Sequence, residues 1–490
     1  MTSKLLLVAP AAPIAIGLCM LLVRERRLLH VLDVAGSLAT LGFGLAIAHR
    51  VASSGPFSAL GVFRADALTI VFLLLIGLLS VAASVASIGW MAQELTAGEL
   101  RKERVHYYFA LVQGFIATML VTVLADNLGV LWIAMEGTTI TSALLVGFHG
   151  HKQGLEAAWK YIIVTTIGIS FGLFGTVLVY GAAAHAQGGV YSGAMNWSSI
   201  VAVSSRLDPG IVRIGFIFVM VGYGTKAGLA PVHMWLPDAH SQAPTPVSAL
   251  LSGALIKCAL YGIVRFHTIA CNACGPAFSE NLWIVFGLVS VVVATPFILV
   301  QHDLKRLLGY HSVEHVGIIA LGLGFGGQLG TFGALLHVIN HGVTKALTFL
   351  VAGDAIGRFG TRDMRIIKGY LSIAPWAGTL LLMGALSLAG MPPFSIFISE
   401  LLIVRAGIGG RHLVAVAVFL LMVVIIFAGL IHHAGQMVFG VAPEGLARGH
   451  ERRWPLVGML LLTSVMILLG IYMPASVNRM LESATEVVLG

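Results

Sequence analysis

Residues 224–266 read GTKAGLAPVHMWLPDAHSQAPTPVSALLSGALIKCALYGIVRF, an apolar segment that contains two lysines and a cluster of prolines. The prolines fall within 16 residues, at Pro231, Pro237, Pro244 and Pro246. A regular helix cannot continue through them, because each proline lacks a backbone donor and clashes with the preceding turn. In a membrane, an interrupted helix is tolerated only where its unpaired backbone groups line a cavity or pack against protein. The segment therefore predicts a discontinuous transmembrane helix.

A second break occurs in the apolar residues 371–406, where the Met-Pro-Pro sequence at 391–393 interrupts the run. Interrupted spans at corresponding places indicate a transporter built from inverted repeats. Each break lies in the fourth span of a block of five. Ordinary proline kinks are the alternative, but Lys226 just before the first break and Glu400 just after the second favour a functional role.

The composition is that of a membrane protein. Of the 490 residues, 58% are hydrophobic and 10% are charged, whereas soluble domains carry about 25% charged residues. Apolar runs long enough to cross a bilayer recur along the whole chain. The 14 predicted spans cover residues 4–23, 29–48, 66–91, 106–124, 126–148, 157–181, 210–229, 246–267, 282–300, 304–325, 329–356, 371–406, 411–439 and 454–474. The net charge of +8 is scattered in short clusters between these runs, which argues against nucleic-acid binding.

The order of the spans predicts an all-α polytopic membrane protein with two inverted five-helix repeats and discontinuous helices 7 and 12. The predicted units are an N-terminal three-helix segment (1–105), a first repeat (106–267), a second repeat (268–439) and a C-terminal helix (440–490). Loops on one side of the membrane hold 16 Lys and Arg residues, against 9 on the other. The richer side should be cytoplasmic, so we expect both termini on the periplasmic side of a bacterial inner membrane.

The four cysteines give little indication of chemistry. Cys271 and Cys274 form a CxxC pair after the eighth span, where the sequence fits either a local disulfide or two free thiols. Zinc would need two further ligands, and the cysteines do not suffice for an iron–sulfur cluster. Glycine-rich nucleotide motifs are missing from the sequence as well. We therefore expect no cofactor and no metal held by this chain itself.

Four lysines lie inside apolar stretches, while the other 25 Lys and Arg residues fall in loops or near helix ends. They are Lys160, Lys226, Lys257 and Lys345. A cation in hydrocarbon costs at least about 2.5–3.5 kcal/mol unless it is paired or hydrated, so such residues mark ion or proton paths. Lys160 alone could reach the nearby interface with its long side chain.

Glu136 lies in the middle of the fifth span, ten residues after Asp126. A carboxylate at that depth either takes up a proton or finds a cation. Lys226 is the predicted partner, because it is also placed in mid-span. Such a pair can hold or release a proton as its separation changes, since proximity favours the charged form of both groups.

Polar residues form a stripe on each of two neighbouring spans. The tenth span carries His311, Glu314 and His315, and the eleventh carries His337, His341 and Lys345. Spacings of three and four residues put the members of each stripe on one helical face. Imidazole can pass a proton between its two nitrogens near neutral pH, so the stripes favour a proton path that Glu400 completes. Zinc is the weaker alternative because the HExxH arrangement is missing, and any single histidine could merely hydrogen-bond to a neighbouring helix.

Residues 224–266 resemble the hallmark sequence of the antiporter-like subunits of respiratory complex I, multisubunit cation/proton antiporters and membrane-bound hydrogenases. The resemblance extends from the Glu136 span to the Glu400 span. Residues 132–148 (WIAMEGTTITSALLVGF) and 310–324 (YHSVEHVGIIALGLG) are most similar to the hydrogenase-4 component F group.

The resemblance implies a 14-helix fold with two inverted five-helix repeats. It also implies that Glu136 and Lys226 form the coupling pair, that Lys257 is the central relay, and that Glu400 opens to the far side. Relatives carry lysine or histidine at the eleventh-span position, where this chain has both types.

Residues and resemblance together predict a proton-translocating, non-redox membrane subunit of an energy-converting oxidoreductase complex. The expected path comprises Glu136, Lys160, Lys226, His233, Asp238, Lys257, His311, Glu314, His315, His337, His341, Lys345 and Glu400. The expected partners are other membrane subunits, lipid and, through those subunits, a soluble redox module of nickel–iron hydrogenase or NADH/quinone type. Three alternatives remain open: a sodium/proton antiporter subunit without a redox partner, a structural scaffold, and a related subunit that serves a bicarbonate-hydrating soluble protein.

Overall fold

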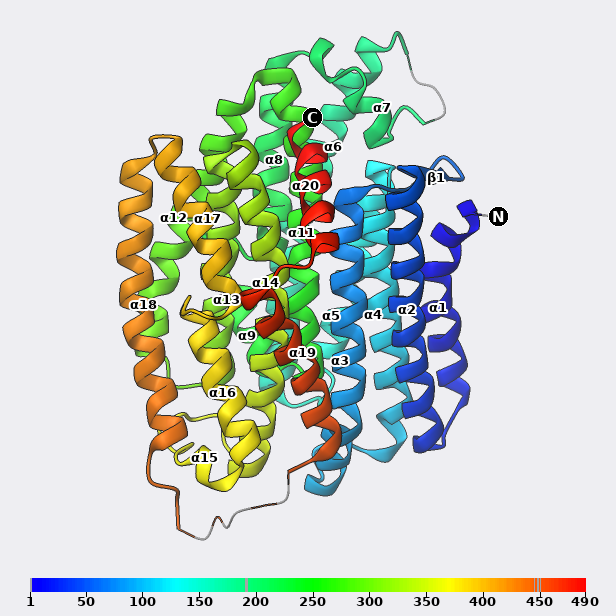
Figure 1. The fold of residues 1–490 in the computed structure, drawn as a ribbon. Coiled ribbons are helices and arrows are strands. Elements are labelled where there is room, and N and C mark those ends of the chain that lie inside the picture. The colour runs from blue at the N-terminus through cyan, green and yellow to red at the C-terminus, as the bar shows by residue number, and fades with distance from the viewer. Residues whose placement is uncertain (1, 190–192, 445, 447–448, 450) are drawn as a thin grey trace.

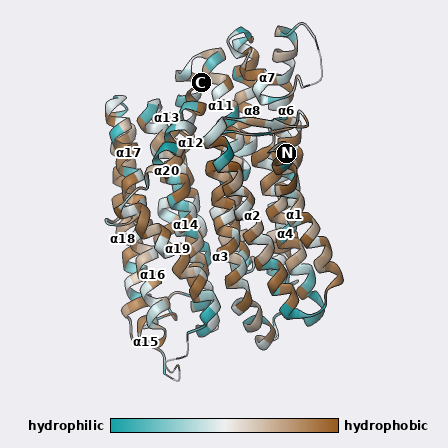
Figure 2. Cartoon of the chain, turned by 45° about the vertical axis from the view of Figure 1, so that its right-hand side comes forward, coloured by the Kyte–Doolittle hydropathy of each residue, from teal (hydrophilic) through white to brown (hydrophobic). Residues whose placement is uncertain are grey.

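The computed structural model describes residues 2–189, 193–444, 446, 449 and 451–490. The long helices run side by side in one bundle (Figure 1). Hydrophobic residues dominate the middle of the bundle, and hydrophilic residues are more frequent toward the helix ends (Figure 2). Among the described residues, 12 helices are long and apolar enough to cross a membrane. The predicted all-α polytopic membrane fold is confirmed.

The N-terminal part consists of η1 (Thr2–Lys4), α1 (Leu5–Leu22), α2 (Arg26–Ser54), β1 (Phe57–Ala59), β2 (Phe63–Ala65) and α3 (Ala67–Ala97). The two strands form an antiparallel hairpin in which Ser58 lies opposite Arg64, an element that the sequence analysis did not predict. Asp66 caps α3 by accepting a hydrogen bond from the backbone N–H of Thr69, which satisfies a donor that the first helical turn leaves free.

The next block contains η2 (Lys102–Arg104), α4 (Val105–Leu124), α5 (Leu128–Val146), α6 (Lys152–Ala186), α7 (Trp197–Val201), η3 (Ser204–Arg206), α8 (Pro209–Ala227), α9 (Trp235–Gln242), α10 (Thr245–Leu250), η4 (Leu251–Leu255) and α11 (Ile256–Cys274). The first predicted break is present, because α8 ends before Gly228, whose φ is +82°, and the chain resumes only as the short α9. Pro244 separates α9 from α10. η4 is a π-helical turn inside the eighth span.

The second block contains α12 (Pro276–Val300), α13 (Leu304–Phe325), α14 (Gly327–Phe359), α15 (Tyr370–Ile373), α16 (Pro375–Leu388), α17 (Ser395–Gly409) and α18 (Leu413–Phe439), and α19 (Arg453–Ile471) and α20 (Ala475–Leu489) follow it. The second predicted break separates α16 from α17. The expectation of a single C-terminal helix is wrong. Two helices are present, since Pro474 stands between them and a regular helix does not pass through proline.

The two blocks pack their helices in the same order. In the first, α4 contacts α5, α5 contacts α6, α6 contacts α8, and α8 contacts α11. In the second, the contacts join α12 to α13, α13 to α14, α14 to α16, and α16 to α18. The first and last members also meet, α4 with α11 and α12 with α18. The division into two repeats stays a prediction, which this shared order supports.

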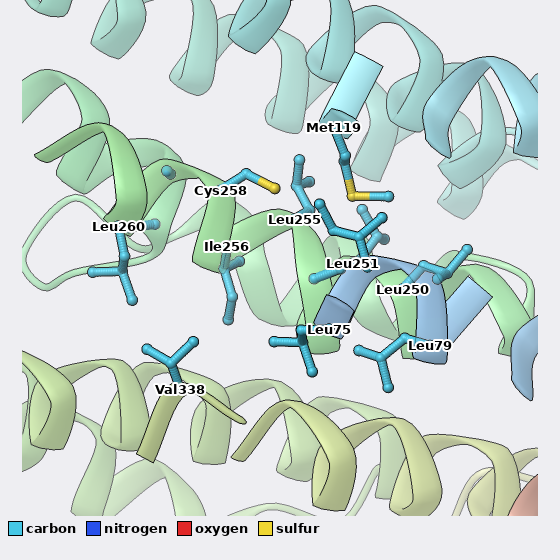
Figure 3. Close-up of a cluster of buried hydrophobic side chains, with 14 of the residues drawn as sticks. Leu75, Leu79, Met119, Leu250, Leu251, Leu255, Ile256, Cys258, Leu260 and Val338 are labelled. Carbon is cyan, nitrogen blue, oxygen red and sulfur yellow. The ribbon is translucent and has the colours of Figure 1, made fainter. Parts of the chain in front are cut away.

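The segment from α10 through η4 to α11 lies at the centre of the bundle, where every residue of its most apolar window is buried. Figure 3 shows Leu251 and Leu255 among Leu79 of α3, Met119 of α4 and Val338 of α14. At Gly253 the backbone of η4 passes so close to α14 that an added Cβ would lie 3.0 Å from the carbonyl oxygen of Gly342. This close approach packs η4, the turn that directly precedes Lys257, against α14, which carries Lys345.

Candidate functional site

Lys226 lies in the last turn of α8, directly before the first helix break, and its side chain is fully buried. Its Nζ donates hydrogen bonds to Thr139 Oγ1 at 2.8 Å and to the Tyr161 hydroxyl at 2.5 Å. The same atom lies 4.6 Å from the centre of the Tyr161 ring. The amine is therefore held by hydroxyl groups and an aromatic face.

Glu136 and its predicted partner Lys226 are joined through a hydroxyl group in the structure. Its carboxylate accepts hydrogen bonds from Thr166 at 3.0 Å and from Thr139 Oγ1 at 3.4 Å. Because Thr139 also accepts from Lys226, its hydroxyl joins the carboxylate to the amine. Glu136 is half-buried and Thr166 is exposed, which places this carboxylate at the edge of the bundle.

Lys257 follows the π-helical turn η4, and the turn provides its acceptor. Its Nζ donates to the carbonyl oxygen of Ser252, five residues earlier, at 2.5 Å. The Ser252 hydroxyl bonds that of Ser312 at 2.8 Å, which connects α13 to this turn. π-helical turns are frequent at functional sites, but nothing in the sequence predicts this one.

The polar stripes of α13 and α14 face each other inside the bundle. His311 Nδ1 lies 2.7 Å from Glu314 Oε2, and His315 Nδ1 lies 3.0 Å from His337 Nε2. The His315 ring stacks on that of His341, with 4.6 Å between their centroids. All five side chains are buried. The structure thus brings together the two stripes that the spacing predicted.

Lys345 and Glu400 lie at the margins of this cluster. Lys345 Nζ donates to the carbonyl oxygen of Leu308 at 2.6 Å. Glu400, which is 9% exposed, lies in α17, just after the second break. Gly390 stands in that break with a φ of +66°, and a Cβ added there would collide with the Glu400 carboxylate. The break therefore makes the space that this carboxyl group occupies.

Two overlapping groups in this cluster have the donor types of a metal site. The ligand atoms of His311, Glu314 and His315 lie within 4.8 Å of one another, and so do those of His315, His337 and Glu400. Imidazole and carboxylate donors suit zinc. In the structure, however, the hydrogen bonds from His311 to Glu314 and from His315 to His337 join these donors to each other, which also suits proton transfer. The expected absence of a metal stays a prediction.

Lys160 does not lie in the apolar interior, in contrast to its predicted place. Its side chain is 51% exposed and forms ion pairs with Glu156 at 2.7 Å and Asp238 at 3.5 Å. The difference arises because α6 begins at Lys152, so Lys160 is only two turns from the helix start and can reach polar partners. Asp238 also pairs with Arg306 at 2.9 Å.

Three buried side chains near these residues were missed by the sequence analysis or assigned to loops. Lys305 is 4% exposed, and its Nζ donates to the carbonyl oxygen of Ala243 at 2.6 Å. His240 is fully buried, and neither ring nitrogen has a hydrogen-bond partner among the described atoms. Arg265 forms two 2.8 Å hydrogen bonds to Asp66. The position of Lys305 two residues into a span suggested a loop cation.

Two further sequence features lie apart from the buried lysines. His233 is buried, but its Nδ1 has no partner among the described atoms and no hydrogen bond links its side chain to Lys226 or Lys257. Cys271 and Cys274 are both free thiols. Of the two states that fit the CxxC pair, the structure therefore has the unbridged one.

Comparison with known proteins agrees with this architecture. Residues 125–426 match the family described as NADH:quinone oxidoreductase/Mrp antiporter, TM. The chain is 37% identical to the hydrogenase-4 component F homolog of Methylacidiphilum infernorum over 353 residues, which are 72% of this chain and 74% of that protein.

Solved structures share the fold along nearly the whole chain. A chain of the membrane-bound sulfane sulfur reductase (MBS), an archaeal respiratory membrane complex, superimposes with a TM-score of 0.88 at 23% identity, covering 99% of this chain and 98% of that one. A chain of the Mrp complex from Dietzia sp. DQ12-45-1b gives a TM-score of 0.83 at 21% identity, covering 100% and 99%. By the match over residues 125–426, the chain belongs to the family described as NADH:quinone oxidoreductase/Mrp antiporter, TM.

Proposed function

We propose that this chain moves protons across the membrane as a non-redox subunit of an energy-converting complex of the hydrogenase-4 type. The observation that carries the proposal is a set of titratable side chains that are buried inside the bundle. The set consists of Lys226, Lys257, Lys345, His311, His315, His337, His341, Glu314 and Glu400. It supplies amines, imidazoles and carboxyl groups in an interior that is otherwise mainly apolar.

The hydrogen bonds of the three lysines suit transient protonation. Lys226 donates to hydroxyl groups, and Lys257 and Lys345 donate to backbone carbonyl oxygens. None of the three forms an ion pair with a carboxylate in the part of the chain that the structure describes. A buried ammonium without a counter-ion is costly, so a proton that reaches one of these amines is readily passed on.

Because Glu136 lies at the edge of the bundle, a neighbouring subunit could act on it and so couple electron transfer to proton movement in this chain. Around Glu136, α5 and α6 expose the apolar side chains of Ile133, Ile140, Ile163 and Ile167. A carboxylate on an apolar membrane face needs a polar or charged partner, so we propose that a neighbouring membrane subunit covers this face. Redox energy released in a soluble module of the complex would act through that subunit on Glu136, and through Thr139 on Lys226.

The charge distribution supports a proposed orientation of the chain in the membrane. We assign the end of the bundle that carries the more basic loops, the lower end in Figure 1, to the cytoplasmic side of a bacterial inner membrane. Both termini lie toward the opposite end (Figure 1), which would then be periplasmic.

The proposal is tested by replacing the central lysine in the assembled complex. We expect Lys257→Met to abolish proton uptake into proteoliposomes, measured with a pH-sensitive dye per electron transferred. Lys257→Arg should fail as well, since a guanidinium does not release its proton. Lys152→Met serves as the control, because Lys152 is exposed at the start of α6. Unchanged uptake in Lys257→Met would count decisively against proton transport by this chain.

The similarity to an Mrp complex supports a second candidate, sodium/proton exchange without a redox partner. Sodium-dependent proton movement in vesicles that lack the redox module would favour it. If the buried residues act only as a scaffold, the Lys257 variants should lose assembly of the complex instead of proton movement in the assembled complex.

A further inference from the structure

A polar hollow of about 1010 Å³ opens between the helix ends at one end of the bundle. Its wall is formed by the end of α3, the connection from α5 to α6, the α9–α10 break, the start of α13 and the end of α14. The rim includes the exposed residues Glu99, His151 and His302, whereas Ser241, Ala243 and Lys305 at the inner end are buried. The hollow thus leads from the surface to buried polar atoms.

The charges of the hollow favour cations. It is lined by five carboxylates and three Lys or Arg side chains, namely Glu94, Glu99, Asp238, Asp303, Asp363, Lys305, Arg306 and Arg362. In the loop after α14, hydrogen bonds from the side chain and the backbone N–H of Arg365 lower the pKa of Asp363 to about 2, so this carboxylate stays charged at neutral pH. Carboxylates that line a cleft can attract cations, including protons, from the aqueous phase. Lys160 and Arg365, which lie outside the lining, pair with two of these carboxylates, Asp238 and Asp363.

Lys305 forms the inner end of the hollow. Its amine is tied to the α9–α10 break through the carbonyl oxygen of Ala243, an acceptor that is available because Pro244 interrupts the helix. The charges that act on Lys305 come from Arg362, Asp303 and Glu94, all of which line the hollow. Its amine can therefore exchange protons with water in the hollow.

His240 lies in α9, three residues before Ala243, whose carbonyl oxygen accepts from Lys305. The charges that act on this ring are those of Lys345, Lys305 and Lys257. It stacks on Phe349 with 5.0 Å between the ring centroids, and Lys345 Nζ lies 5.9 Å from the centre of the Phe349 ring. A fully buried imidazole with two unpartnered nitrogens can accept a proton at one nitrogen and release one from the other.

We propose that this hollow is the aqueous mouth of the proton path, and that Lys305 and His240 carry protons from its inner end to Lys345 and Lys257. A proton from water in the hollow binds the Lys305 amine, leaves it for a ring nitrogen of His240, and passes from that imidazolium to the amine of Lys345 or Lys257. No other covalent bond changes. The inference rests on the proposed function and adds Lys305 as the group that takes up protons from the aqueous phase.

The first test compares three replacements of Lys305 in the assembled complex, with proton uptake per electron as the readout. We expect Lys305→Met to lower uptake at least tenfold. Lys305→Arg can still bond to Ala243 but does not release its proton, so it should also be slow, whereas the titratable imidazole of Lys305→His should restore part of the rate. Lys152→Met should behave as the unchanged protein. Full activity in Lys305→Arg would show that Lys305 only holds the break in place, which would overturn the proposal.

The second test probes the hollow itself. In a protein whose native cysteines have been replaced, Gln242→Cys places a thiol on the wall of the hollow. A positively charged methanethiosulfonate reagent should modify it from the aqueous phase and lower proton uptake, while the cysteine-free parent stays unaffected. Unchanged uptake after complete modification would contradict a role for the hollow as the mouth.

The experiments distinguish a wrong assignment of the mouth from a wrong proposed function. If Lys257→Met loses uptake while Lys305→Met and the modified Gln242→Cys protein transport normally, the mouth lies elsewhere and the proposed function stands. If Lys257→Met also transports normally, the proposed function itself is wrong. Thermal melting of each purified variant shows whether a loss of uptake reflects unfolding.

Discussion

Replacing Thr139 by valine would test the connection between Glu136 and Lys226. Thr139 Oγ1 accepts a hydrogen bond from Lys226 Nζ at 2.8 Å and donates to the Glu136 carboxylate at 3.4 Å. Valine has nearly the same shape as threonine but has no hydroxyl group. The substitution therefore removes the bridge while leaving Lys226 its bond to the Tyr161 hydroxyl.

The expected loss of proton uptake in Thr139→Val follows from the two hydrogen bonds that the substitution removes. A hydrogen bond to a charged group contributes about 1.5–3 kcal/mol, and the longer contact to Glu136 adds less because 3.4 Å exceeds the usual hydrogen-bond distance. If the bridge couples the two groups during transfer, its loss raises the barrier by a similar amount. Since about 1.4 kcal/mol corresponds to a factor of ten, proton uptake should fall by about ten- to a hundredfold.

Thr138→Val is the matched control. Thr138 is the adjacent residue on α5 and is also buried, but its hydroxyl donates only to the carbonyl oxygen of Met135 in its own helix, at 2.7 Å. Both variants lose one buried hydroxyl, so a general effect on packing should appear in both. Proton uptake and electron transfer would be measured together in proteoliposomes. Equal uptake in the Thr138 and Thr139 variants would refute the bridge.

Three further predictions concern the buried charges, the second break and the thiols. Arg265→Leu removes both 2.8 Å hydrogen bonds from Arg265 to the buried Asp66 carboxylate and leaves it the longer ion pair with Arg64 at 3.7 Å. The free energy of unfolding should therefore fall by up to about 3–5 kcal/mol, seen as a lower melting temperature in detergent; an unchanged melting temperature would contradict this role. Gly390→Val should displace the Glu400 carboxylate and reduce proton uptake with electron transfer preserved, and normal uptake would show that this position of Glu400 is not needed. The CxxC pair at 271–274 is unbridged, so a reducing agent should leave the melting temperature unchanged, whereas a shift would indicate a disulfide.

Much of the fold could be predicted because bilayers restrict the choices. Apolar runs of spanning length identify helices, and proline marks where they stop, which is why both breaks were predicted from Pro231 and from the proline pair at 392–393. The histidine stripes were equally readable, since spacings of three and four residues require one helical face. The contact between the stripes of α13 and α14 could not be predicted from the sequence, because it depends on how the two helices pack.

The features that the sequence left hidden arise from backbone irregularity and tertiary packing. Nothing in residues 251–255 signals a π-helical turn, yet this turn supplies the acceptor for Lys257. From the sequence, Lys305 is expected to be a cation at the membrane interface. In the structure the α9–α10 break packs against it and accepts its hydrogen bond. Lys160 shows the reverse case, because it lies in an apolar stretch but Glu156 and Asp238 provide partners at the surface. Burial of a charge follows from its neighbours, which local sequence does not specify.

The helix irregularities and the buried lysines act together. Lys257 donates to a carbonyl in the π-helical turn, and Lys305 donates to one at the break before α10. A carboxylate in either place would stabilise the ammonium form and hold its proton, because an opposite charge nearby favours ionisation. A carbonyl oxygen accepts a hydrogen bond from the amine without carrying a full negative charge. It therefore favours the ammonium form less than a carboxylate would, and the amine can gain and lose a proton more easily. Irregular turns thus supply acceptors that a regular helix keeps for its own backbone, and they do so beside two of the lysines on the proposed path.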